Sequence, residues 1–221
     1  MSDLVCERCG ASFSLPEQLR ERYPTWRPRL CRACHAKGAG PAAADSSPTR
    51  PAVGRLRRGR VEENLAVGDV LERYSAGPTT GVFTDGSANP NPGPGGWGAV
   101  YVVDDEIVDQ SYGHEPRTTN NRMELTALIH GCDLVPKGQA TTIYTDSRLA
   151  YDTITKWAES WKRRGWKRKT GEISNLDLVK ELYGRMTSRP ELRLEWIPAH
   201  RGFRWNEYAD SLSTAYVREE L

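Results

Sequence analysis

Residues 80–87 read Thr-Gly-Val-Phe-Thr-Asp-Gly-Ser and residues 141–147 read Thr-Thr-Ile-Tyr-Thr-Asp-Ser, so a short apolar run ends twice in the same Thr-Asp-polar phrase. A carboxylate at the end of a buried strand is costly unless a cation or hydrogen bonds offset the cost. The repetition therefore indicates that Asp85 and Asp146 are brought to one place. Glu124 lies between them in the chain. Three acids of this kind would hold a hard divalent cation, which prefers oxygen ligands.

The hydrophobic pattern from about residue 78 predicts strand, strand, strand, helix, strand, helices, strand and helix. The expected strands are 82–85, 97–103, 106–112, 141–146 and 192–198, and the main helices are 121–135 and 206–217. A crossover helix precedes the fourth strand, which should therefore run parallel to the first. We predict an α/β fold with a five-stranded mixed sheet of order 3-2-1-4-5, flanked by helices. Its ligand would bind where the strand order reverses, beyond the ends of strands one and four.

The composition is that of an ordinary globular protein: 221 residues, 38% hydrophobic, 27% charged and a net charge of +2. This length allows one α/β domain and a small module. There is no apolar run long enough to span a membrane. The N-terminus also lacks the basic and apolar regions of a secretory signal. We expect a cytoplasmic monomer with no membrane partner.

Four of the five cysteines form two Cys-x-x-Cys pairs, Cys6 with Cys9 and Cys31 with Cys34. Two such turns suit one tetrahedral thiolate zinc site. The alternatives are two disulfides, which a reducing compartment disfavours, or a redox motif, which needs only one pair. We expect one structural Zn²⁺ that makes residues 1–37 a zinc-binding module, because so short a chain cannot build a sufficient core.

Residues 38–77 are expected to be a linker and a short pre-domain segment with a short helix within 61–76, and residues 78–221 form the larger domain. The basic and aromatic residues of the module would suit nucleic acid by charge and stacking. Equally, the aromatic residues would simply pack around the zinc turns, or the module would bind a protein partner. Cys132 lies in an apolar helical pattern and is expected in the core.

The motifs of the larger domain resemble those of ribonuclease H of type 1 over about residues 79–218. In family order they are Phe-Thr-Asp-Gly-Ser (83–87), Asn-Pro-Gly-Pro-Gly-Gly-Trp-Gly (91–98), Thr-Asn-Asn-Arg-Met-Glu-Leu (119–125), Tyr-Thr-Asp-Ser (144–147), Trp-x3-Trp-Lys-Arg-Arg-Gly-Trp-Lys (157–167) and His-x-Gly-x3-Asn-Glu-x2-Asp (200–210). The resemblance implies an endonuclease that hydrolyses the RNA strand of RNA–DNA hybrids and leaves 5′-phosphate and 3′-hydroxyl ends.

The resemblance also implies roles for individual residues. Asp85, Glu124, Asp146 and Asp210 would be four catalytic carboxylates that hold two Mg²⁺ ions, for which Mn²⁺ would substitute. His200 would be a mobile histidine that assists proton transfer or product release. Asp210 taken alone would be read as a surface acid of the last helix, so its assignment depends on the joint pattern.

The expected contacts with the hybrid fall into groups by the resemblance. Asn91, Asn120 and Asn121 match positions that face the minor groove, where short amides can bond to base edges and the 2′-hydroxyl. Arg117 and Asn175 match phosphate-contacting positions in some relatives. Arg148 stands where many relatives carry an uncharged residue, and we expect it to alter the affinity for the RNA strand.

Residues 156–169 carry seven basic residues against the single acid Glu159, with tryptophans interleaved. Such a segment would project a cationic patch toward the DNA strand, the basic protrusion of the family. The expected contacts are Trp157, Trp161, Lys162, Arg163 and Arg164. We expect Trp157 and Trp166 mainly to pack and Trp161 to lie nearer the DNA.

Two other functions fit parts of the pattern. A non-catalytic module that binds hybrids or senses R-loops would need basic groups rather than clustered acids. Another nuclease or a resolvase on the same fold would not need the basic protrusion or the Asn-Asn-Arg-Met-Glu phrase. The full set of motifs therefore favours the ribonuclease.

Overall fold

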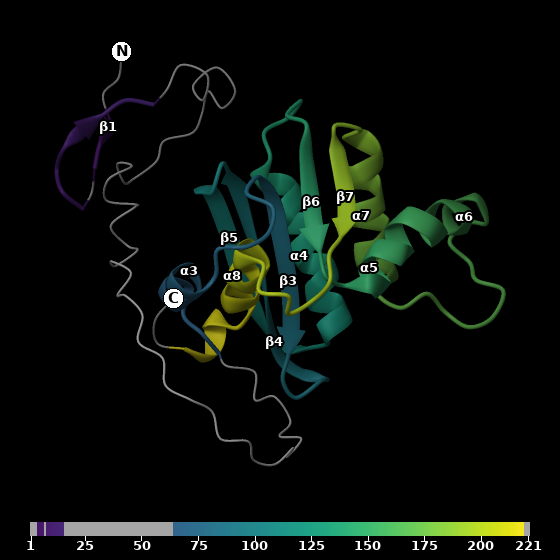
Figure 1. The fold of residues 1–221 in the computed structure, drawn as a ribbon. Coiled ribbons are helices and arrows are strands. Elements are labelled where there is room, and N and C mark those ends of the chain that lie inside the picture. The colour runs from purple at the N-terminus through teal and green to yellow at the C-terminus, as the bar shows by residue number, and fades with distance from the viewer. Residues whose placement is uncertain (1–3, 7, 16–63, 219–221) are drawn as a thin grey trace, which may run out of the picture.

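The computed structural model describes residues 4–6, 8–15 and 64–218 (Figure 1). Residues 64–218 form a five-stranded sheet with helices packed on both of its faces. Its strands are β3 (Gly81–Ala88), β4 (Gly93–Val103), β5 (Glu106–Thr118), β6 (Thr141–Thr145) and β7 (Leu192–Trp196). The helices are α3 (Val67–Arg73), α4 (Asn120–Leu134), α5 (Arg148–Asp152), the π-helical turn η1 (Thr153–Trp157), α6 (Ala158–Arg163), α7 (Leu176–Ser188), α8 (Arg204–Ser213) and the 3₁₀ turn η2 (Ala215–Val217). Cys31, Cys34 and the linker through residue 63 lie outside the described residues.

The sheet order is β5-β4-β3-β6-β7, as the sequence pattern predicted. β3 pairs antiparallel with β4 and parallel with β6, and β6 pairs parallel with β7. The strand order therefore reverses between β3 and β6, and their carboxyl ends lie side by side.

β4 begins at Gly93, four residues before the strand start expected at residue 97, so the glycine-rich residues 93–96 also belong to the strand. Gly95 and Gly96 pair with Ala88 and Ser87 of β3. A Cβ added at Gly96 would lie 2.2 Å from the Ser213 carbonyl oxygen, and one at Gly98 would lie 2.5 Å from Leu212 Cβ. The glycines thus make room for α8 against the sheet.

The two faces of the sheet bury alternate residues of the same strands, as period-two geometry requires. Val82 and Tyr101 join the cluster that packs with α4 and α7, whereas Phe83 and Val100 join the cluster with α3 and α8. Each fully buried aliphatic or aromatic side chain of this kind contributes about 1.5–3 kcal/mol. Both faces are therefore covered, and the ends of the strands remain for a site.

α4 begins one residue earlier than predicted, and its N-cap is Thr119. The Thr119 hydroxyl accepts a hydrogen bond from the Arg122 backbone N–H, which leaves the Asn121 side chain exposed inside the first turn. The expected buried stripe of α4 is confirmed, and it includes Cys132, which is 1% exposed. In the described part of the chain, no helix has the length and apolar character needed to cross a bilayer.

The short helix expected within residues 61–76 is α3, and it packs against α8. Its Val70 is 1% exposed and belongs to the same apolar cluster as Trp205 and Leu212. The Ser211 hydroxyl of α8 also donates to the Leu65 carbonyl oxygen at 2.7 Å. α3, which precedes the first strand of the sheet, therefore contributes to the apolar core between the sheet and α8.

Candidate active site

Asp85 and Asp146 are placed by the parallel pairing of β3 with β6. Thr84 pairs with Thr145, so the residues that follow them meet at the same edge of the sheet. Asp85 is 8% exposed, and Asp146 is half-buried. The prediction that the two Thr-Asp phrases deliver their acids to one place is confirmed by this register.

Glu124 reaches the same place because α4 crosses β3 at a glycine. A Cβ added at Gly86 would lie 2.2 Å from the Glu124 backbone nitrogen, a distance that side-chain atoms do not tolerate. Gly131 makes a second close approach, since its Cβ would lie 2.8 Å from Thr84 Cγ2. The absence of these side chains lets the first turn of α4 lie directly against the end of β3.

Asp85, Glu124 and Asp146 each offer an oxygen atom, and these three atoms lie within 4.8 Å of one another. Glu124 Oε2 is buried and has no hydrogen-bond partner in the structure. A buried carboxylate oxygen without a donor is costly, and a cation is the partner that three converging carboxylates suit. The donor set therefore fits a hard divalent metal.

The electrostatics of the cluster agree with this reading. Burial, followed by the charges of Asp210 and Asp146, raises the pKa of Asp85 well above its usual value. Burial and the neighbouring acids likewise raise the pKa of Glu124 well above its usual value. Burial also raises the pKa of Asp146, although a hydrogen bond from Asn206 and the nearby His200 act in the opposite direction. Acids that repel one another in this way are typical of metal and catalytic sites.

α8 contributes three polar residues to the site at positions i, i+4 and i+7, which share one face of a helix. Asn206 donates to Asp146 Oδ2 at 3.1 Å, and Ser213 donates to Asp85 Oδ2 at 2.7 Å. Asp210 lies between them in the helix, where its charge raises the pKa values of Asp85 and Glu124. Sequence reasoning found Asp210 but missed the contacts of Asn206 and Ser213.

His200 and Trp196 lie on the Asp146 side of the cluster. His200 is exposed in the loop after β7 and has a positive φ of 53°. Trp196 donates from Nε1 to the Asp146 carbonyl oxygen at 3.0 Å, and its ring is 38% exposed. The Arg148 guanidinium lies over that ring, 5.1 Å from its centroid. Sequence reasoning identified Arg148 but not the tryptophan that supports it.

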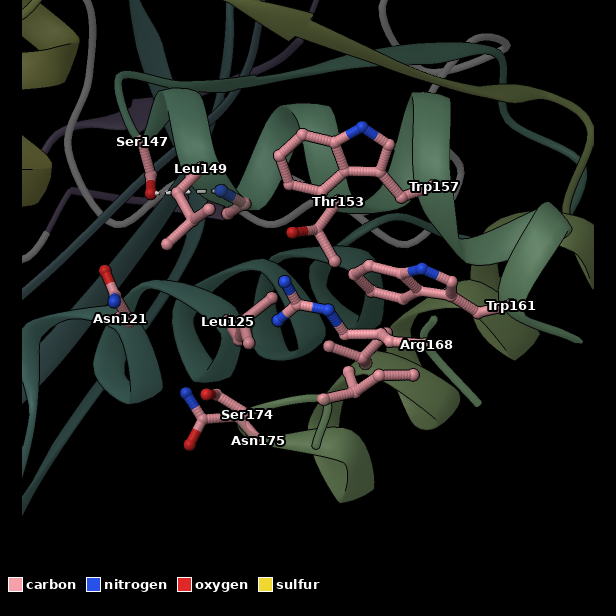
Figure 2. Close-up of a pocket in the computed structure, with 13 residues that line it drawn as sticks. Asn121, Leu125, Ser147, Leu149, Thr153, Trp157, Trp161, Arg168, Ser174 and Asn175 are labelled. Atoms are coloured by element: carbon pink, nitrogen blue, oxygen red, sulfur yellow. Dashed lines mark hydrogen bonds between the residues drawn. The ribbon is translucent and has the colours of Figure 1, made fainter. Parts of the chain in front are cut away.

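A cavity of about 490 Å³ opens between the first turn of α4, the α5–α6 segment and the start of α7 (Figure 2). Leu125 and Ser147, which follow Glu124 and Asp146 in the chain, are among the residues that line it. Four of the predicted substrate contacts line it: Asn121, Trp157, Trp161 and Asn175. Figure 2 also shows the Arg168 side chain reaching into the cavity beside Trp161. Arg168 belongs to the basic run, but it could not be singled out from the sequence, because the direction of its side chain depends on the loop after α6.

The expected packing of the tryptophans is partly wrong. Trp157 is 39% exposed, whereas Trp161 and Trp166 are half-buried against the main core. The reason is η1, whose π-helical turn changes the direction of Trp157 relative to a regular helix. Lys162, Arg163 and Arg164 are exposed at the end of α6, as expected for a cationic patch.

The remaining predicted contacts surround the strand ends. Asn120 Oδ1 accepts from the Ala88 backbone N–H at 2.6 Å, and Asn91 Oδ1 accepts from the Asn120 N–H at 3.3 Å. These two amides therefore tie the β3–β4 connection to α4. Arg117 is exposed near the end of β5.

The first cysteine pair lies in the turn between β1 (Leu4–Val5) and β2 (Ser12–Phe13). The Cys6 N–H donates to the Ala11 carbonyl at 2.9 Å, and the Gly10 N–H donates to the Cys6 carbonyl at 2.8 Å. This brings Cys6 and Cys9 into one tight turn. The other predicted ligands, Cys31 and Cys34, lie outside the described residues.

Comparison with known proteins agrees with this site. The sequence profile of the family described as RNase H matches residues 78–218. A ribonuclease H of Methylorubrum extorquens is 42% identical over 63% of this chain, and the match spans 60% of that relative's length. A ribonuclease H of Pseudomonas savastanoi is 41% identical over 62% of this chain and 92% of its own. The foamy viral protease-reverse transcriptase, solved in complex with an RNA/DNA hybrid, matches at a TM-score of 0.51 and 16% identity, over 77% of this chain and 23% of the viral one. At that identity the likeness shows the fold alone.

Proposed function

This chain belongs to the RNase H family of enzymes, and on that premise we propose that it is an endonuclease that hydrolyses the RNA strand of RNA–DNA hybrids with two divalent metal ions. The observation that carries the proposal is the convergence of Asp85, Glu124 and Asp146 within 4.8 Å, with Glu124 Oε2 buried and unpartnered. A protein that only bound nucleic acid would gain nothing from acids at this point, because they repel phosphate.

The proposed metal ligands are Asp85, Glu124, Asp146 and Asp210, and Mg²⁺ or Mn²⁺ suits their oxygen atoms. Bound cations of this kind neutralise developing charge and lower the pKa of a water molecule. Asp85 is central, because it faces each of the other acids. Asn206 holds the Asp146 carboxylate, which would orient the attacking water. Attack on phosphorus would break the bond to the 3′ oxygen and leave 3′-hydroxyl and 5′-phosphate ends.

His200 is proposed to carry protons at the edge of the site. It is exposed and lies near Asp146, whose pKa it lowers. An imidazole can act as a general acid, so a histidine here can give a proton to a leaving oxygen. Because it is not a metal ligand in this proposal, its loss would slow cleavage without abolishing it.

We place the hybrid across the strand ends and the cavity. Asn91, Asn120, Asn121 and Arg148 would meet the RNA strand, where amides can bond to the 2′-hydroxyl. The exposed cationic end of α6 and the cavity with its two tryptophans would meet the DNA strand, through charge and stacking. The contacts assigned to the DNA side are Trp157, Trp161, Lys162, Arg163, Arg164 and Asn175, with Arg117 on the opposite side near β5.

For the chain as a whole we propose a zinc-binding module at 1–37, a linker and pre-domain segment at 38–77 and the catalytic domain at 78–221. The tight turn that holds Cys6 and Cys9 supports half of a tetrahedral zinc site. Cys31 and Cys34 would complete it.

The test is cleavage of a labelled RNA–DNA hybrid, with RNA and DNA duplexes of the same sequence as controls, in Mg²⁺ and in chelator. We expect cutting of the RNA strand of the hybrid alone, and only with metal. Binding of the hybrid without cutting would instead favour a sensing module. Cutting of a DNA duplex would indicate another nuclease of the same fold.

A further inference from the structure

Ser213, the last residue of α8, is fully buried, and its hydroxyl oxygen lies 2.7 Å from Asp85 Oδ2. We infer that Ser213 is a positioning residue that holds the Asp85 carboxylate in the orientation required for cation binding. The inference rests on the proposed function, because it concerns the same metal site.

The direction of this hydrogen bond follows from counting protons. The Ser213 hydroxyl has one proton and three neighbours: Asp85 Oδ2 at 2.7 Å, the Asp210 carbonyl at 2.9 Å and the Ser87 hydroxyl at 3.2 Å. An ionised Asp85 that binds a cation has no proton to donate and can only accept. The Ser213 proton must then point to Asp85, and the Ser87 hydroxyl must donate to Ser213.

The Asp210 carbonyl, 2.9 Å away, is the weaker competitor for this proton. It already accepts from the Thr214 backbone N–H at 3.1 Å and from the Thr214 hydroxyl at 3.1 Å. Donation to Asp85 is also charge-assisted, which makes it the stronger of the two choices. The result is a chain of donors from Ser87 through Ser213 to the carboxylate.

This arrangement suits a metal ligand. A carboxylate has about four lone-pair directions. The Ser213 hydroxyl on Oδ2 and the Gly86 backbone N–H together fix the rotation of the Asp85 carboxylate and leave the remaining directions for cations. The hydroxyl comes from α8 on one face of the sheet, whereas Glu124 comes from α4 on the other. Asp85 is thus held from the side opposite Glu124. Donors that orient a metal ligand in this way generally change metal affinity when they are removed.

The chain offers a matched control in Ser211. It lies in the same helix, is 2% exposed and donates a hydrogen bond of the same 2.7 Å length, but to the Leu65 carbonyl. Ser211→Ala therefore removes a comparable buried donor, together with the oxygen that accepts from Arg218, without touching Asp85. Ser213→Cys is a second test variant, because a thiol keeps the side chain's shape but is a weak donor.

The experiment measures Mg²⁺ binding without substrate, by calorimetry and by the rise of Tm with added Mg²⁺, in the full chain and the three variants. We expect Ser213→Ala and Ser213→Cys to bind Mg²⁺ about 10-fold more weakly, with Ser211→Ala equal to wild type. Cleavage by the Ser213 variants should recover when Mg²⁺ is raised. If Ser213→Ala does not fold, Ser213→Cys decides.

The possible failures are distinct. A wild-type protein that does not respond to Mg²⁺ would contradict the proposed function itself. A wild-type response that both Ser213 variants share unchanged would overturn only the role of Ser213. Equal weakening in Ser211→Ala would also overturn it, because the effect would then belong to the stability of α8.

Discussion

Replacing Asp85 by asparagine should abolish cleavage and at the same time stabilise the metal-free protein. Burial and the charges of Asp210 and Asp146 raise the pKa of Asp85, so the folded protein disfavours its ionised form. At 4.8 Å and an effective dielectric constant of about 20, two unit charges repel by about 3.5 kcal/mol. Partial protonation of the cluster relieves part of this repulsion. We therefore expect a net gain of about 1–3 kcal/mol, or about 2–10 °C in Tm.

The gain should depend on pH with a definite sign. A carboxyl group whose pKa is raised by folding stabilises the protein fully below its unfolded pKa and loses that contribution as pH rises through the folded pKa. Asparagine has no such loss, so the advantage of Asp85→Asn should grow from acidic to neutral pH. Saturating Mg²⁺ should stabilise the wild type more than the variant and reduce the difference.

The assay is thermal unfolding in chelator and in Mg²⁺ across a pH series, with cleavage of the hybrid measured in parallel. Asp109→Asn is the control, because Asp109 is exposed on the edge strand β5, away from the cluster. A lower Tm for Asp85→Asn in chelator, or a gain that does not change with pH, would refute the argument that these acids repel one another. Retained cleavage would refute the metal site.

Three further changes test other parts of the molecule. Gly86→Ala should lower the free energy of unfolding by about 3 kcal/mol or more and abolish cleavage, since the added Cβ would lie 2.2 Å from the Glu124 nitrogen. Gly184→Ala is the control, because a Cβ at that position meets no atom within 4 Å. It should be neutral or stabilising in the same unfolding assay. Arg148→Ala should weaken hybrid binding and reduce the slope of log affinity against log salt by about 1, and an equal loss in the exposed Arg193→Ala of β7 would argue against a specific contact. Cys6→Ser should lower the zinc content of the purified protein, measured by elemental analysis, while Cys132→Ala should leave it unchanged; zinc-free wild-type protein would contradict the module.

The sequence predicted the sheet and the three clustered acids because these depend on local pattern. An apolar run that ends in Thr-Asp defines both a strand and the position of its acid, and a crossover helix makes the two strands parallel. Asp210 required more than local pattern, since an acid on a short amphipathic helix is usually a surface residue. Its identification depended on the spacing of the whole His200–Asp210 motif.

The features that sequence reasoning missed depend on packing between distant segments. Ser213 and Asn206 reach the acids only because α8 lies against the sheet with one particular rotation. The early start of β4 at Gly93 was missed, because glycine is a weak strand signal and the helix that needs the missing side chains lies far away in the chain. Trp157 was misplaced because a π-helical turn cannot be read from periodicity that assumes a regular helix.

The phrase Asp-Gly-Ser at residues 85–87 shows how one short motif can serve three packing requirements. Asp85 supplies the central carboxylate, Gly86 lets α4 approach closely enough to bring Glu124, and the Ser87 hydroxyl forms a hydrogen bond with the hydroxyl of Ser213 from α8. The positions of α4 and α8 relative to Asp85 therefore depend on Gly86 and Ser87, the two residues that follow Asp85 in β3. A substitution at position 86 or 87 would change no metal ligand, yet it would move Glu124 or remove a hydrogen-bond partner of Ser213, which holds Asp85. The site is thus specified as much by how closely the two helices approach β3 as by the acids themselves.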